Sequence, residues 1–216
     1  AYEIVSRDWS SDVCSSDLAE GTKLIRRAAE LGNADAQVEM GARYRKGKGV
    51  AIDRAEALRW VTKAAEQNYP PGQTALGEAY QDGDGIAQNY AEALKWFKLA
   101  AAKNYGPALN DLGLMYENGR GVKQDGMEAI KWYQLGAGMQ DPQAQLNLGL
   151  LYDSGKLVPQ DDAEAVKWFR KAAVQNVALA QYNLGLKYAD GKGVPVNDAR
   201  AYMWLSVAHS MLVVDF

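Results

Sequence analysis

The chain offers few side chains whose type and spacing could support chemistry. With one cysteine, Cys14, and one histidine, His209, it cannot form an internal disulfide or a zinc site built from several such ligands. Glycine pairs that could cradle a phosphate begin at Gly47, Gly83, Gly119 and Gly191. No predicted strand precedes these pairs, as the dinucleotide-binding fingerprint requires. We therefore predict no catalytic residue, no metal site and no cofactor.

Composition excludes further classes of partner. The 216 residues are 48% hydrophobic and 24% charged, and they carry a formal net charge of -3. That balance lacks the basic footprint that binding to nucleic-acid phosphates requires, so no nucleic-acid partner is expected. No run approaches the roughly 18 consecutive apolar residues of a membrane span. These exclusions leave the class of partner to be decided by the pattern of the sequence.

A repeat of 36 residues organises the chain. Three columns of identical residues keep this step without a slip, and packing alone explains them. They are Gly41, Gly77, Gly113, Gly149 and Gly185; Tyr44, Tyr80, Tyr116, Tyr152 and Tyr188; and Trp60, Trp96, Trp132, Trp168 and Trp204.

Each repeat predicts two helices, A and B, joined by a glycine loop. Leu76, Gly77 and Tyr80 share one face of helix A. Helix B opens with capping boxes, Asp53 to Glu56 and its equivalents, which only Asn197 to Arg200 breaks. It ends at residues that accept the left-handed conformation, namely Gly32, Asn68, Asn104 and Asn176. The fold class is therefore all-α, built from antiparallel helix pairs.

The pattern A-x3-L-G-x2-Y-x2-G-x-G-V-x2-D-x2-E-A-x2-W-x3-A-A resembles the Sel-one-like repeat, a relative of the tetratricopeptide repeat. The resemblance covers roughly residues 19 to 210, with Met40 replacing leucine in the first unit. It implies a right-handed superhelical α-solenoid that acts as a protein-binding scaffold. It also slightly favours a bacterial periplasmic or secreted location and leaves the cytoplasm open.

The ends depart from the pattern. We expect a leader over residues 1–18, an orphan helix B over 19–32, five repeats over 33–68, 69–104, 105–140, 141–176 and 177–210, and an apolar tail over 211–216. The segment DWSSDVCSSDL resembles a translated sequencing adapter, which suggests that the native N-terminus is missing; a disordered Ser/Asp-rich leader is the alternative. Uncapped ends leave self-association open.

The columns that vary should carry specificity. On helix A, positions equivalent to 38, 42 and 45 lie opposite the core and are expected to line a concave groove. We predict a binding face there, formed by Tyr182, Leu186, Leu150, Leu146, Leu114, Asn110, Glu78 and Arg45. The alternative is that the leucines only pack between successive A helices. Four of the B helices also have a basic residue three positions after a glutamate, and we expect these basic residues to lie on a solvated convex face. They are Arg59, Lys95, Lys131 and Lys167.

Three functions fit these observations. The first is a non-catalytic adaptor that holds a segment of another protein in the groove. The second is a β-lactam-binding or hydrolysing enzyme like some cysteine-rich relatives, but these carry paired cysteines in each unit and this chain does not. The third is a structural spacer within a longer chain.

Overall fold

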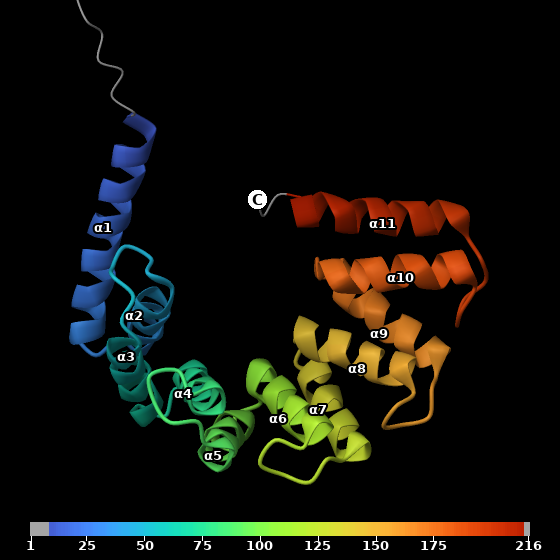
Figure 1. Ribbon diagram of the computed structural model, residues 1–216, viewed down its shortest axis with the longest axis horizontal. Coiled ribbons are helices and arrows are strands. Elements are labelled where there is room, and N and C mark those ends of the chain that lie inside the picture. The colour runs from blue at the N-terminus through green and yellow to red at the C-terminus, as the bar shows by residue number, and fades with distance from the viewer. Residues whose placement is uncertain (1–8, 214–216) are drawn as a thin grey trace, which may run out of the picture. The chain divides into compact units, whose positions relative to one another are not determined.

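The computed structural model describes residues 9–213, with side chains from Leu18 to Met211, and contains only helices in that range (Figure 1). The all-α prediction is therefore confirmed. The helices are α1 (Trp9–Glu30), α2 (Ala34–Lys46), α3 (Arg54–Glu66), α4 (Pro70–Asp82), α5 (Tyr90–Ala101), α6 (Gly106–Asn118), α7 (Gly126–Gly138), α8 (Pro142–Ser154), α9 (Asp162–Val174), α10 (Ala178–Asp190) and α11 (Asp198–Val213).

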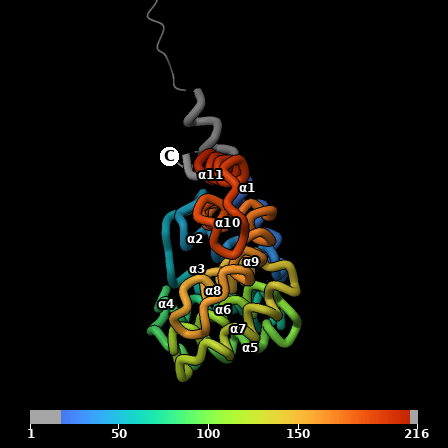
Figure 2. The backbone as a smooth tube through the Cα atoms, turned by 90° about the vertical axis from the view of Figure 1, so that its right-hand side faces the viewer, coloured from blue at the N-terminus to red at the C-terminus, as the bar shows by residue number. Residues whose placement is uncertain are grey.

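The chain divides into two compact units, residues 1–96 and 97–216, and the boundary falls inside α5. In unit 1, α2 packs on α3 and α3 on α4. In unit 2, the pairs α6 with α7, α8 with α9 and α10 with α11 follow one another, and α10 and α11 lie side by side in both views (Figures 1 and 2). Each of these three pairs is one helix A and one helix B of the repeat.

A backbone hydrogen bond closes the loop of every pair. The N–H of the residue that caps helix B donates to the carbonyl of the repeated tyrosine in helix A, as from Asp53 to Tyr44 (3.0 Å) and from Asn197 to Tyr188 (2.9 Å). The N–H of the third helical residue donates to the cap side chain, as predicted, for example from Glu164 to Asp161 (2.9 Å). The reciprocal half of the predicted capping box does not form, because the cap N–H already has the tyrosine carbonyl as its partner.

The ends of the B helices agree with the prediction. Asn68, Asn104 and Asn176 adopt φ angles of 60°, 57° and 63°, and Gln140 takes the same left-handed conformation with φ 62°. The glycine after each A helix does so too, as Gly191 shows with φ 71°. Left-handed residues therefore terminate helices at both kinds of turn.

The glycine column brings helices A and B of a pair into close contact. A Cβ atom built on Gly149 would lie 2.6 Å from Phe169 Cδ1, and one on Gly185 would lie 2.7 Å from Leu205 Cγ. The side chain of helix B that packs against the glycine thus belongs to the residue that follows the repeated tryptophan. The tryptophan column also packs in the core: Trp60 is 4% exposed, and Trp168 is half-buried against a core cluster, although Phe169 beside it is buried completely.

Buried glutamines connect successive pairs. Gln181 donates to the carbonyl of Ala173 (3.0 Å), and Gln37 donates to the carbonyl of Ala29 at the same distance (3.0 Å). Each amide therefore satisfies a carbonyl at the end of the preceding helix B, which an alanine or leucine could not do. Sequence analysis missed this column.

At the N-terminal end, α1 begins at Trp9 rather than near residue 19. Leu24 is 66% exposed and Leu31 is 82% exposed, in agreement with the expectation that apolar residues of this helix lack a cover. Thr22 is buried and accepts a hydrogen bond from Arg43 (2.7 Å), which ties α1 to α2. Residues 1–8 of the expected leader lie outside the described range.

We predict that Gly149→Ala destabilises the chain by about 1–3 kcal/mol, because the added methyl would overlap the Phe169 ring in a packed core. The measurement is chemical or thermal unfolding followed by circular dichroism. Gly138→Ala is the matched control, since nothing lies within 4 Å of a Cβ built there. Equal stability of the two variants would contradict the packing role of the glycine column.

Candidate functional site

The predicted binding residues divide between the two units. Arg45 on α2 and Glu78 on α4 belong to unit 1 and form an ion pair of 3.5 Å between two partly exposed side chains. Burial raises the pKa of Glu78, and the guanidinium of Arg45 opposes that rise. These two residues therefore connect adjacent A helices at the surface, and the remaining predicted residues lie in unit 2.

Burial removes two predicted residues from the surface. Leu146 is 5% exposed and packs in a core cluster with Val166 and Leu184. Asn110 is 8% exposed, and its side-chain oxygen accepts a hydrogen bond from Asn147 of the next A helix (2.8 Å). Both side chains pack between successive A helices, which is the alternative that the sequence left open for the leucines. We leave them out of the proposed site.

Leu114 and Leu150 are intermediate cases. Leu114 is half-buried against the core cluster that contains Ile130 and Leu148, and Leu150 is half-buried against the next cluster along the chain. They support the helices and present only part of their surface to a partner.

Tyr182 and Leu186 on α10 are the exposed apolar members of the predicted set, at 45% and 38%. Tyr182 occupies the column of Thr74, Asn110 and Leu146, which are all buried. Leu146 packs with Leu184 of the next A helix, whereas no A helix follows α10 within residues 9–213.

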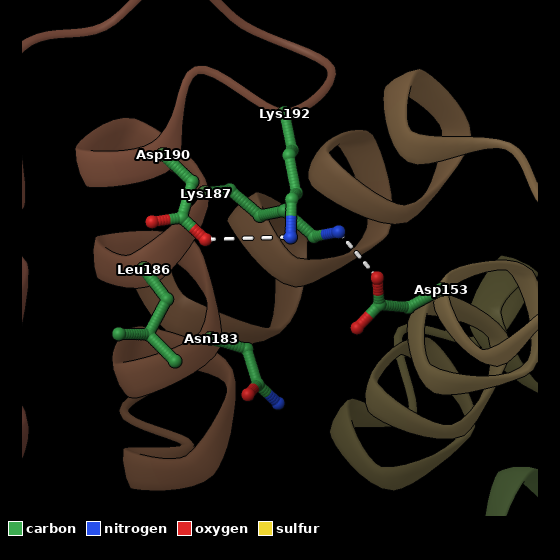
Figure 3. A pocket seen from close by; sticks show the side chains of 6 residues that line it. All are labelled: Asp153, Asn183, Leu186, Lys187, Asp190 and Lys192. Carbon is green, nitrogen blue, oxygen red and sulfur yellow. Dashed lines mark hydrogen bonds and ion pairs between the residues drawn. The ribbon is translucent and has the colours of Figure 1, made fainter.

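A hollow of about 150 Å³ lies beside Leu186, between α10 and α8. It is lined by Asp153, Asn183, Leu186, Lys187, Asp190 and Lys192 (Figure 3). Asn183, Leu186 and Asp190 come from one face of α10, and Asp153 faces them from α8 (Figure 3). The hollow therefore has one apolar wall and an otherwise polar lining.

Lys187 lines this hollow and is fixed there by two ion pairs. Its side chain is 7% exposed and pairs with the carboxylates of Asp153 on α8 and Asp162 on α9, the latter at 2.5 Å. Burial lowers the pKa of Lys187, but the hydrogen bonds to the two carboxylates together raise it by more, so the net change is upward. The hydrogen bond from Lys187 is the main cause that lowers the pKa of Asp162. The lysine is thus a fixed positive charge that connects three helices.

The amide of Asn183 is unpaired inside the hollow. Its Nδ2 atom is buried and has no hydrogen-bond partner among the described residues. The equivalent amide one repeat earlier, Asn147, donates to Asn110. For Asn183 the corresponding position is Leu146, which offers no acceptor. An unsatisfied buried donor costs about 1–3 kcal/mol, so an acceptor from a ligand would be favoured here.

Asn183 and Lys187 were not among the predicted site residues. Lys187 could have been found, because it follows Ala79, Met115 and Leu151 in its column, where only Arg43 of the first repeat is also basic. The unpaired amide of Asn183 depends on which side chain the preceding repeat presents, so it required the structure. Among the described residues, no group of three or more His, Cys, Asp or Glu side chains could hold a metal ion. In the same part of the chain, no helix is long and apolar enough to cross a membrane.

Comparison with protein families gives one match. The model of the Sel1 repeat matches six segments, residues 11–33, 34–69, 70–105, 106–141, 142–176 and 178–208. The first segment covers part of α1, and the other five correspond closely to the repeats expected from the sequence. A search of curated proteins gave no match.

Several solved structures share the fold. A Sel1 repeat protein from Oxalobacter formigenes is 33% identical, with a TM-score of 0.77, over 89% of this chain and 84% of that one. A protective antigen of uropathogenic Escherichia coli is 34% identical, with a TM-score of 0.74, over 90% of this chain but only 42% of that one. A Sel1 repeat protein from Klebsiella pneumoniae is 24% identical, with a TM-score of 0.62, over 87% and 91% of the two chains, and shows the fold alone.

We predict that Lys187→Met lowers the melting temperature at pH 7 by about 2–4 °C, equivalent to roughly 1 kcal/mol, because it removes two charge-assisted hydrogen bonds. The methionine itself fits a column that already contains Met115.

The difference from the wild type should depend on pH in a defined direction. The pKa of Asp162 is lowered from 3.8 in the folded state, so its stabilisation is present above about pH 3.8 and is lost as the pH falls through the lowered value. The pKa of Lys187 is raised from 10.5, so its stabilisation is lost only above that pH. Melting curves from pH 2.5 to 8 test this, with Lys131→Met as the control, because Lys131 is exposed on α7 and its ion pair with Glu128 (2.6 Å) does not involve Asp162. A constant difference across that range would show that the ion pairs contribute nothing.

Proposed function

The chain belongs to the Sel1 repeat family, and from this premise we propose that it is a non-catalytic adaptor that binds an extended segment of another protein on α10 and α8 of unit 2. Sel1 repeat proteins are generally protein-interaction scaffolds, and their solenoid is typically non-enzymatic. The observation that carries the proposal is the hollow with the unpaired Asn183 amide, bordered by the exposed side chains of Tyr182 and Leu186.

The unpaired donor favours an extended segment over a helix. In a bound helix, most main-chain carbonyls are already hydrogen-bonded within the helix. An extended segment presents free carbonyls along its length, and one of them could accept from Asn183 Nδ2. This would satisfy a buried donor that has no partner in the free chain.

The apolar neighbours supply the rest of the interface. Tyrosine combines a large apolar ring, a hydroxyl group and few rotatable bonds, which is why it is frequent at binding hot spots. Tyr182 and Leu186 are four residues apart on α10, so both side chains lie on the same side of that helix. A side chain of the bound segment could pack on both while its main chain reaches Asn183.

We predict that Tyr182→Ala weakens binding of the partner by about thirtyfold, equivalent to about 2 kcal/mol, while circular dichroism and the melting temperature stay nearly unchanged. The side chain is 45% exposed, so its truncation opens no closed cavity. The partner is first isolated by crosslinking to the wild-type chain and is then titrated against each variant.

Lys131→Ala is the control, because Lys131 is exposed on α7 and pairs only with Glu128 (2.6 Å). It should leave the affinity unchanged. If Tyr182→Ala unfolds the chain, the residue belongs to the core; if affinity follows Lys131 instead, the partner binds to the B helices. Either result would reject the proposed site.

A further inference from the structure

The fifth repeat reverses a charge that the four preceding B helices share. Those helices each begin with a glutamate that pairs with a basic residue three positions later, as Glu164 does with Lys167 (2.8 Å). In α11 the glutamate is replaced by Arg200 and the basic residue by Met203. Neither member of the pair is kept.

This replacement has a local cost. The N-terminal turn of a helix carries a partial positive charge, which favours glutamate and disfavours arginine. Arg200 is the third residue of α11, and its backbone N–H is capped by Asn197 (2.9 Å), so the cap itself is intact. The Arg200 side chain lies against Tyr188, with its guanidinium carbon 5.4 Å from the centre of the tyrosine ring.

Arg200 converges with a second arginine on one oxygen atom. Its Nη1 donates to the hydroxyl oxygen of Tyr188 at 3.0 Å, and Nη2 of Arg170, on α9, donates to the same oxygen at 3.0 Å. Tyr188 is 4% exposed, whereas both arginines are exposed. Within the described residues, neither guanidinium forms an ion pair with a carboxylate.

The equivalent tyrosine one repeat earlier lies in the opposite electrostatic field. Burial raises the pKa of Tyr152, and the negative charges of Glu164 and Asp161 raise it further. Burial also raises the pKa of Tyr188, but hydrogen bonds from Arg200 and Arg170 outweigh burial and make the net shift downward. The hydroxyl of Tyr152 therefore lies near negative charges, whereas that of Tyr188, at the same position of the next repeat, lies near positive ones.

We propose that Arg170, Arg200 and the Tyr188 hydroxyl form a binding site for an oxyanion, either a carboxylate or a phosphate carried by a protein segment. Guanidinium groups bind both through charge-assisted, often paired, hydrogen bonds. Because the Tyr188 oxygen accepts from both arginines, its own proton is free to be donated to the ligand. The site lies where α10 faces α9 and α11, and none of its three residues lines the hollow beside Leu186.

The test uses the full chain and inorganic phosphate as the first probe, at constant ionic strength with chloride as the reference. Binding is followed by NMR with labelled tyrosine. The Tyr188 signal should shift in a saturable way, whereas the Tyr152 signal, where Glu164 replaces the arginine, should not. Two peptides that differ only in phosphoserine or aspartate then identify the source: tighter binding of the first indicates a phosphorylated segment, and equal binding indicates an acidic one.

The repeat supplies variants that should fold. Arg200→Glu restores the residue of the four preceding B helices, and Arg170→Gln introduces the residue that Gln134 provides in the third repeat. Each should weaken phosphate binding by about tenfold or more, since a charge-assisted hydrogen bond is lost. Lys131→Ala should leave the affinity unchanged. The proposal is overturned if Tyr188 shows no saturable shift, or if Arg200→Glu binds phosphate as the wild type does while its melting temperature is unchanged.

Discussion

The close approach of the two helices in each pair is the constraint on which the rest of the structure depends. It requires glycine in helix A, because any Cβ there would overlap a buried side chain of helix B, as Gly149 and Phe169 illustrate. With that contact fixed, the tyrosine carbonyl lies within hydrogen-bond distance of the residue that caps helix B, and a backbone hydrogen bond closes the loop. The next pair can then attach through the buried glutamines, such as Gln181 on Ala173.

A repeated core of this kind also separates structural residues from candidate functional ones. A column that keeps its residue type through every repeat is explained by packing, so a departure within one repeat calls for a separate reason. Lys187 departs from the Ala79, Met115 and Leu151 of the three preceding repeats and connects α8, α9 and α10 through two carboxylates. Arg200 departs from a column of glutamates and meets Arg170 at the Tyr188 hydroxyl. Both departures lie in the fifth repeat of the chain.

The period of 36 residues predicted the helix pairs, the left-handed residues at Asn68, Asn104 and Asn176, and the fold class, because these depend on local chemistry that recurs. It could not predict what depends on two repeats together. Leu146 looked like a groove residue on an isolated helical wheel, yet the following A helix buries it to 5% exposure. The contact of the glycine with the residue after the tryptophan, as between Gly149 and Phe169, also depends on how the two helices of a pair meet, so the spacing alone did not identify it.

The same coupling between repeats generates the binding features. Asn110 and Asn147 satisfy each other across two A helices, but Leu146 leaves the next amide, Asn183, without an acceptor. A single leucine therefore strengthens the core on one side and creates an unpaired donor on the other. The proposed partner site needs no dedicated loop or insertion, since it lies where one repeat fails to satisfy its neighbour. On this proposal, specificity changes by substitution in the variable columns while the glycine and tyrosine columns keep the fold unchanged.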